Sequence, residues 1–93
     1  MAVRLIVTYS VKPGKAGDFA AAFAPLIREV HKEDGCEQYE LFSSRDDPDR
    51  LVLLERWTDQ AKLDAHIAAL RARGPSPTAA YREGNAVMER YEV

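Results

Sequence analysis

The sequence contains a single cysteine, Cys36, among its 93 residues. One cysteine excludes a disulfide within the chain and a cysteine-based metal cluster, and it fits a reducing compartment. The chain also lacks an apolar run long enough to cross a membrane, and its first ten residues, M-A-V-R-L-I-V-T-Y-S, have no basic segment of the kind that opens a signal peptide. We therefore expect a cytoplasmic protein that is not inserted in a membrane.

An excess of basic residues is also absent. Lysine and arginine number 13 against 15 aspartate and glutamate, which gives a formal net charge of -2. Nucleic-acid and anionic-membrane partners are therefore not expected. The two histidines lie far apart, with no carboxylates at ligand spacing, so the sequence predicts no metal site. A chain of this length buries one core, and we expect a single domain over residues 1–93.

The amino-terminal third predicts a strand followed by a helix. Apolar residues alternate from Val3 to Val11, and Pro13-Gly14 ends this strand. Apolar residues at helical spacing then predict a helix from about Lys15 to Lys32. Pro25 interrupts the hydrogen bonding of this helix, but the apolar spacing continues past it. We expect one bent helix there.

The rest of the chain predicts a hairpin, a second helix and a last strand. The turn-forming sequence R-D-D-P-D-R links the two strands of the hairpin, and Thr58 or Asp59 can cap the helix that follows. The predicted elements are strands Cys36 to Ser43 and Leu51 to Thr58, a helix to about Arg73 ended by Gly74-Pro75, a short turn at Ala79 to Arg82, and a strand from Ala86 to Glu92.

This order describes an α+β fold of the ferredoxin-like βαββαβ type, an antiparallel sheet with two helices on one face. The second face then has no cover, yet several strands are apolar at both parities, as in L-V-L-L-E-R-W. A sheet with two apolar faces needs a second layer. A second copy of the chain would supply it, so we expect a homodimer with its two sheets packed face to face, a dimeric α+β barrel.

The segment W-T-D-Q-A-K-L-D-A-H runs from the end of a strand to the inner face of a helix. It places the indole of Trp57 and the imidazole of His66 in the same space beneath the sheet. Two interpretations stay open at this stage. The space is either a pocket with one titratable group or a packed core.

Several segments together resemble the antibiotic biosynthesis monooxygenase family of small dimeric α+β barrel proteins. The likeness lies in V-K-P-G-K followed by D-F-A-A-A-F, in D-G-C-E-Q-Y-E-L-F, and in L-V-L-L-E-R-W-T-D-Q-A-K-L-D-A-H, which cover roughly the first seventy residues. The resemblance implies the fold, the dimer and a pocket between sheet and helices. The family spans ring oxidation, haem breakdown and isomerisation-like chemistry.

The chain departs from the active members of that family in two respects. Those enzymes are described as using an asparagine with a tryptophan and either a tyrosine or a histidine, and Trp57 corresponds to their tryptophan. The only asparagine, Asn85, precedes the last strand and matches no such position. His66 lies one helical register from the expected haem ligand, so haem degradation is disfavoured.

The candidate catalytic residues are His66, Glu55 and Trp57. His66 is a candidate general base because burial on an apolar helix face favours its neutral form, although a core histidine fits the same position. Glu55 shares a strand face with Trp57, and its carboxylate needs a partner such as His66 or an arginine. Trp57 is a candidate aromatic wall or a core residue. The candidate substrate-binding residues are Tyr9, Tyr39 and Tyr81, the last as a lid residue in the long connection.

Together with the family resemblance, these residues predict oxidation of a small phenol or hydroquinone by O2 without metal or flavin. Removing the phenol proton creates an anion that can pass an electron to oxygen, so the site needs a base, aromatic walls and a dry pocket. One alternative is a non-catalytic dimer that binds a small ligand or is associated with stress. Another is an isomerase of small oxo-compounds on the same fold.

Overall fold

The structure is a computed structural model that describes all 93 residues. Its elements, in chain order, are β1 (Val3–Ser10), α1 (Ala16–Val30), β2 (Cys36–Ser43), β3 (Arg50–Trp57), α2 (Gln60–Arg73), the 3-10 helix η1 (Ala79–Tyr81) and β4 (Val87–Glu92). This is the predicted order of strands and helices. Neither α1 nor α2 combines the length and the apolar character that crossing a membrane requires.

Most predicted boundaries differ from the observed ones by one or two residues. α1 runs unbroken through Pro25, so the prediction of one helix is confirmed. Asp59 caps α2, because its side chain accepts a hydrogen bond from the backbone N–H of Lys62 at 2.9 Å. The first strand ends at Ser10, and Val11 instead forms an isolated antiparallel bridge with Arg82.

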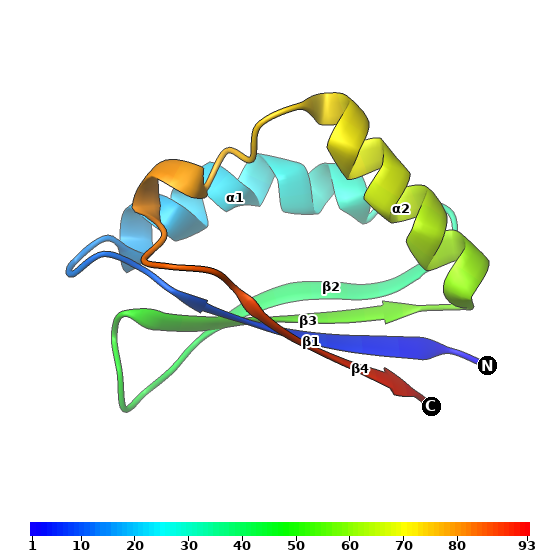
Figure 1. Cartoon of the computed structure of the whole chain (residues 1–93), viewed down its shortest axis with the longest axis horizontal. Helices are drawn as coiled ribbons and strands as arrows, with labels where there is room; N and C mark the ends of the chain where they lie inside the picture. Colours follow the sequence, from blue (N-terminus) through cyan, green and yellow to red (C-terminus); the bar gives the residue numbers. More distant parts are fainter.

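The four strands form one antiparallel sheet in the order β2-β3-β1-β4. Both helices cover the same face of this sheet, and the opposite face has no covering element (Figure 1). The predicted ferredoxin-like βαββαβ fold is therefore confirmed. β1 and β3 occupy the centre, so their helix-facing side chains are the ones most fully covered.

Strand alternation and helical spacing together build the core beneath the helices. Every second residue of β1 and β3 is buried, and α1 contributes Phe19 and Phe23, which pack edge to face with ring centroids 5.7 Å apart. The buried helix-facing strand residues are Val3, Leu5, Val7 and Tyr9 on β1, Leu51, Leu53, Glu55 and Trp57 on β3, and Tyr39 on β2. Glu55 is the one charged residue among them.

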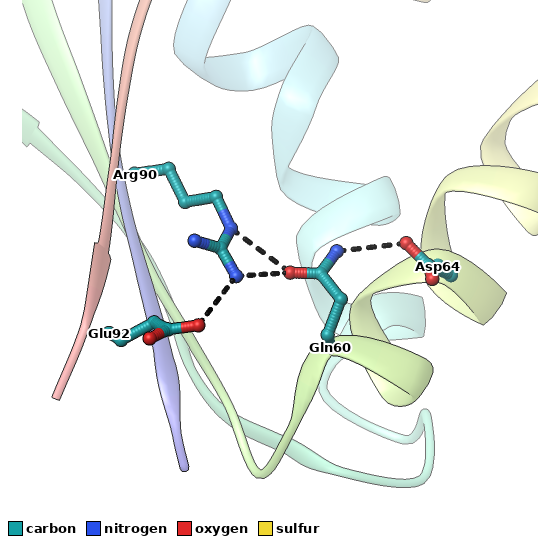
Figure 2. A network of polar contacts seen from close by, with 4 residues as sticks. All are labelled: Gln60, Asp64, Arg90 and Glu92. Carbon is teal, nitrogen blue, oxygen red and sulfur yellow. Dashed lines mark hydrogen bonds and ion pairs between the residues drawn. The ribbon is translucent and has the colours of Figure 1, made fainter.

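The edge strand β4 is tied to the start of α2 by a polar network (Figure 2). The Nε and Nη2 groups of Arg90 both donate to Oε1 of Gln60, at 3.0 and 2.6 Å, and Gln60 in turn donates to Asp64 at 2.9 Å. Nη2 of Arg90 also lies 3.5 Å from Glu92. All residues of β4 are exposed.

The uncovered face of the sheet has an apolar centre. Residues paired across antiparallel strands point to the same face, and two cross-strand rows form this centre: Phe42, Val52, Thr8 and Val87, and then Glu40, Leu54, Ile6 and Glu89. The next row, of Gln38, Arg56, Arg4 and Tyr91, is polar. Phe42 is 45% exposed and Val87 is 63% exposed. Apolar residues therefore lie on both faces of the sheet, as predicted. This face is where we expect a second copy of the chain to pack.

Candidate functional site

Trp57 and His66 lie in direct contact. Trp57 ends β3 and is 0% exposed, while His66 projects from α2 and is 2% exposed. Their rings stack with centroids 4.5 Å apart and an angle of 29° between the planes. The sequence left open whether a pocket or a packed core lies between the two rings, and the structure has a packed core.

Glu55 is buried beside this pair. The indole Nε1 of Trp57 donates to Oε1 of Glu55 at 3.0 Å, and Nε2 of His66 lies 4.0 Å from the same oxygen. The carboxylate of Glu55 therefore accepts a hydrogen bond from the neighbouring Trp57, whereas the expected partner His66 lies farther away. Burial raises the pKa of Glu55, although the bond from Trp57 and the nearby His66 act in the opposite direction.

Glu33, which the sequence did not single out, completes the cluster. Its Oε1 lies 2.9 Å from Nδ1 of His66, and its side chain is 23% exposed. Glu33 follows α1 in a turn, where no helical or strand pattern indicates the direction of a side chain. The imidazole therefore bridges a carboxylate that reaches the surface and a carboxylate that is buried under the helices. We refer to Glu33, His66, Glu55 and Trp57 as the carboxylate–imidazole cluster.

A separate cavity of about 280 Å3 opens between the sheet and the two helices. Its floor is formed by Tyr9 of β1, Tyr39 of β2 and Phe23 of α1, and its rim by Leu26, Leu70 and residues 74–77. Neither Trp57 nor His66 lines this cavity. Tyr39 separates it from the cluster, because its ring contacts His66 edge to face with centroids 5.4 Å apart.

Tyr9 and Tyr39 both line the cavity, and neither hydroxyl makes a hydrogen bond within the chain. Burial raises the pKa of Tyr9 to about 12 and also raises the pKa of Tyr39. Both phenols therefore stay protonated near neutral pH, where they can donate hydrogen bonds to a ligand but cannot accept its proton.

Arg82 forms another wall of the cavity. Its guanidinium carbon lies 5.1 Å from the centroid of the Tyr9 ring, within the range of a cation–π contact. Its Nε and Nη2 groups donate to the hydroxyls of Thr78 and Ser76 at 3.1 to 3.2 Å. Thr78 is 1% exposed, so this anchor is fixed within the long connection between α2 and β4.

The structure brings two of the three predicted substrate-binding tyrosines to one cavity. Tyr81 is half-buried in η1 and packs against the core without lining that cavity. The residues that sequence reasoning missed are Glu33 and Arg82. No three His, Cys, Asp or Glu side chains gather in a way that would hold a metal ion.

Comparison with known proteins places these features in a family. A sequence model of the family described as "Antibiotic biosynthesis monooxygenase" matches residues 2–72. The "Putative monooxygenase YcnE" of Bacillus subtilis is 34% identical over 64 residues, which cover 69% of this chain and 67% of that protein.

Solved structures extend the similarity to nearly the whole chain. A conserved protein from Methanosarcina mazei superposes with a TM-score of 0.88 at 29% identity, covering 98% of this chain and 91% of the other. A "Putative antibiotic biosynthesis monooxygenase" from Nitrosomonas europaea gives 0.87 at 25% identity, covering 97% and 88%. The fold of these proteins includes the region beyond residue 72 that forms the rim of the cavity.

Proposed function

This chain belongs to the antibiotic biosynthesis monooxygenase family, and from that premise we propose that it oxidises a small phenol or hydroquinone with O2, without metal or flavin. The observation that supports this substrate class most strongly is the cavity over Tyr9 and Tyr39. It combines aromatic walls with two phenol hydroxyls that are free to donate hydrogen bonds. These are the groups that would hold a planar ring and stabilise a phenolate oxygen.

Such a reaction balances without an added reductant. A phenol and O2 give a quinone and one water, since one oxygen atom enters the ring and the other leaves with two hydrogens of the substrate. The substrate supplies all four electrons. A hydroquinone gives a hydroxyquinone and water by the same balance. The protein then has to bind the ring, stabilise its anion and exclude bulk water.

The substrate hydroxyl must also lose a proton, and we assign its acceptance to the pair of Glu55 and His66 in a state in which the Tyr39 ring has moved aside, since neither residue of the pair lines the cavity. The pair lies behind Tyr39, whose ring contacts His66 and whose position on β2 pairs with Glu55 on β3. Burial raises the pKa of Glu55, which brings this carboxylate closer to the range useful for a general base. Glu33 connects His66 to the surface, where the proton can leave.

We further propose that the protein acts as a homodimer through the uncovered face of its sheet. The cavity lies on the opposite face, between the sheet and the helices. Pairing of two sheets would therefore cover Phe42, Leu54 and Ile6 and leave the cavity open to substrate.

One observation favours a second candidate, a non-catalytic dimer that binds a small ligand. Trp57 and His66 are stacked and almost fully buried, and neither reaches the cavity. In this alternative the carboxylate–imidazole cluster is a structural feature of the core, and the cavity binds a ligand without converting it.

Oxygen uptake distinguishes the two candidates. The protein is treated with EDTA and given a panel of phenols and hydroquinones, and consumption of O2 is compared with the rate of autoxidation without protein. With 18O2, one labelled atom should appear in the quinone product and one in water. Uptake no faster than autoxidation for every compound would exclude the oxygenase and favour the binding protein.

Two conservative variants test the cavity itself. Tyr39→Phe removes a hydroxyl from the cavity, and loss of a hydrogen bond to a charged oxygen should lower kcat/KM by roughly tenfold or more. Tyr81→Phe is the matched control, because Tyr81 lies outside the cavity lining and its variant should keep the activity. Equal losses in both variants would place the reaction elsewhere.

A further inference from the structure

The charged residues around the cavity all have the same sign. Three arginines line it, Arg71 and Arg73 at the end of α2 and Arg82 after η1, and no aspartate or glutamate does. The whole chain carries a net charge of -2, so the positive charge around the cavity is a local feature that the overall composition does not explain. A hollow lined by cations in this way attracts anions and raises their local concentration.

Two of the three partly covered arginines, Arg4 and Arg82, have no carboxylate partner, and of these two only Arg82 lines the cavity. Arg56 pairs with Glu37 at 2.8 Å, and Arg4 donates to the side chain of Gln38. Arg82 makes no ion pair and is held only by the neutral hydroxyls of Ser76 and Thr78. Its Nη1 group has no partner within the chain. A half-buried guanidinium with no carboxylate partner and a free donor is suited to binding an anionic group from outside.

The remaining lining limits the body of the ligand. Phe23, Leu26 and Leu70 are apolar, and the rings of Tyr9 and Tyr39 provide aromatic surface. A dry cavity of about 150 Å3 is known to hold benzene. The volume of about 280 Å3 here leaves room for one or two rings with polar substituents.

We propose that the cavity binds a small aromatic carboxylate, with Arg82 binding the carboxylate group and Tyr9 and Tyr39 contacting the ring. Arg71 and Arg73 guide the anion to the opening. The assignment of this acid as the substrate rests on the proposed function, whereas its binding can be measured without any turnover.

Equilibrium binding tests the proposal directly. Benzoate, 4-hydroxybenzoate and 2,5-dihydroxybenzoate are titrated into the protein by calorimetry under nitrogen, each beside its methyl ester. The ester keeps the ring and removes the charge. Each acid should bind about tenfold or more tightly than its ester, because a charge-assisted hydrogen bond is lost in the ester. The difference should shrink at high salt if the arginines are partly open to solvent.

Variants identify the residues that cause the preference for the acid over its ester. Arg82→Gln should bring the acid and the ester to nearly equal affinity, whereas Arg45→Gln should leave the ratio unchanged, since it removes one positive charge from an exposed position outside the cavity. If Arg82→Gln fails to fold, the double variant Arg71→Gln/Arg73→Gln should still weaken binding of the acid, because both residues are exposed and line the opening.

The outcomes separate this proposal from the proposed function. Equal affinity for acids and esters in the unaltered protein, or no binding of any acid, overturns the carboxylate proposal even if the protein consumes oxygen with neutral phenols. Acids that bind with the predicted preference but are not oxidised support the carboxylate site and count against the oxygenase.

Discussion

The imidazole of His66 stacks on the indole of Trp57, with ring centroids 4.5 Å apart, and its two nitrogens face two different carboxylates. Nδ1 lies 2.9 Å from Glu33 and Nε2 lies 4.0 Å from Glu55. A buried ring between two acidic groups links the surface to the interior of the fold. The same arrangement makes His66 a packing residue, so its removal should affect stability as well as any reaction.

Replacing His66 by alanine should destabilise the protein by roughly 1 to 3 kcal/mol, because the change leaves a void against Trp57 and a buried Glu55 without its imidazole. Urea denaturation measures the effect. His31→Ala is the control, because His31 is exposed and its ring bonds only to the backbone oxygen of Tyr39, so it should lose less. An equal loss in the two variants would contradict the role of His66 in the core.

Replacing Glu55 by glutamine should stabilise the protein increasingly as pH rises. Burial holds the pKa of Glu55 above its ordinary value of 4.5, so between these two values the native state binds more protons than the unfolded state. The stability of the unaltered protein therefore falls as pH rises through that interval. Glutamine does not titrate and can still accept the hydrogen bond from Trp57.

Urea denaturation of both proteins at pH 4, 5.5 and 7 gives the difference in their free energies of unfolding. This difference should move in favour of Glu55→Gln between pH 4 and pH 7. Glu83→Gln, which removes an exposed carboxylate outside the sheet, corrects for the change in net charge. A difference that does not vary with pH would show that burial of Glu55 has no effect on its proton binding.

The fold was predictable because its signals are local. β1 alternates cleanly, and its apolar residues at every second position are buried. β3 is apolar at both parities in its first half, so the pattern alone did not say which face the helices cover. In the structure Leu51 and Leu53 face the helices, while Val52 and Leu54 lie on the uncovered side.

The site was less predictable because the cavity depends on segments without periodicity. Arg82 reaches Tyr9 only because the long connection after α2 folds back and Val11 pairs with Arg82. Nothing in the spacing P-S-P-T-A-A-Y-R indicates that the arginine, and not Tyr81, lines the cavity. Trp57 and His66 were correctly placed together, but whether a space remained between them depends on side-chain packing, which the sequence pattern does not give.

Replacing Gly35 by alanine should cost more stability than the same change at Gly84. Both residues have a positive φ, +87° and +72°, which costs an alanine roughly 1 kcal/mol or more. At Gly35 the added Cβ would also meet the side chain of Lys62 on α2, whereas at Gly84 it would meet open space. Thermal unfolding should show the larger drop in Tm for Gly35→Ala. Equal drops would show that Lys62 moves aside freely.

Placing a charge on the uncovered face of the sheet should dissociate the proposed dimer. Leu54 lies in a central strand of that face, and Leu54→Asp would bury a carboxylate between two apolar sheets, where it has no partner. Sedimentation should give a dimer for the unaltered protein at micromolar concentration and a monomer for this variant, because a sheet-to-sheet interface should bury on the order of 2,000 Å2 or more.

Ala68→Asp introduces the same charge at an exposed position of α2 and should remain dimeric. A monomer in all three samples would show that the apolar face is not covered by a second copy, and a dimer in all three would show that the copies meet elsewhere.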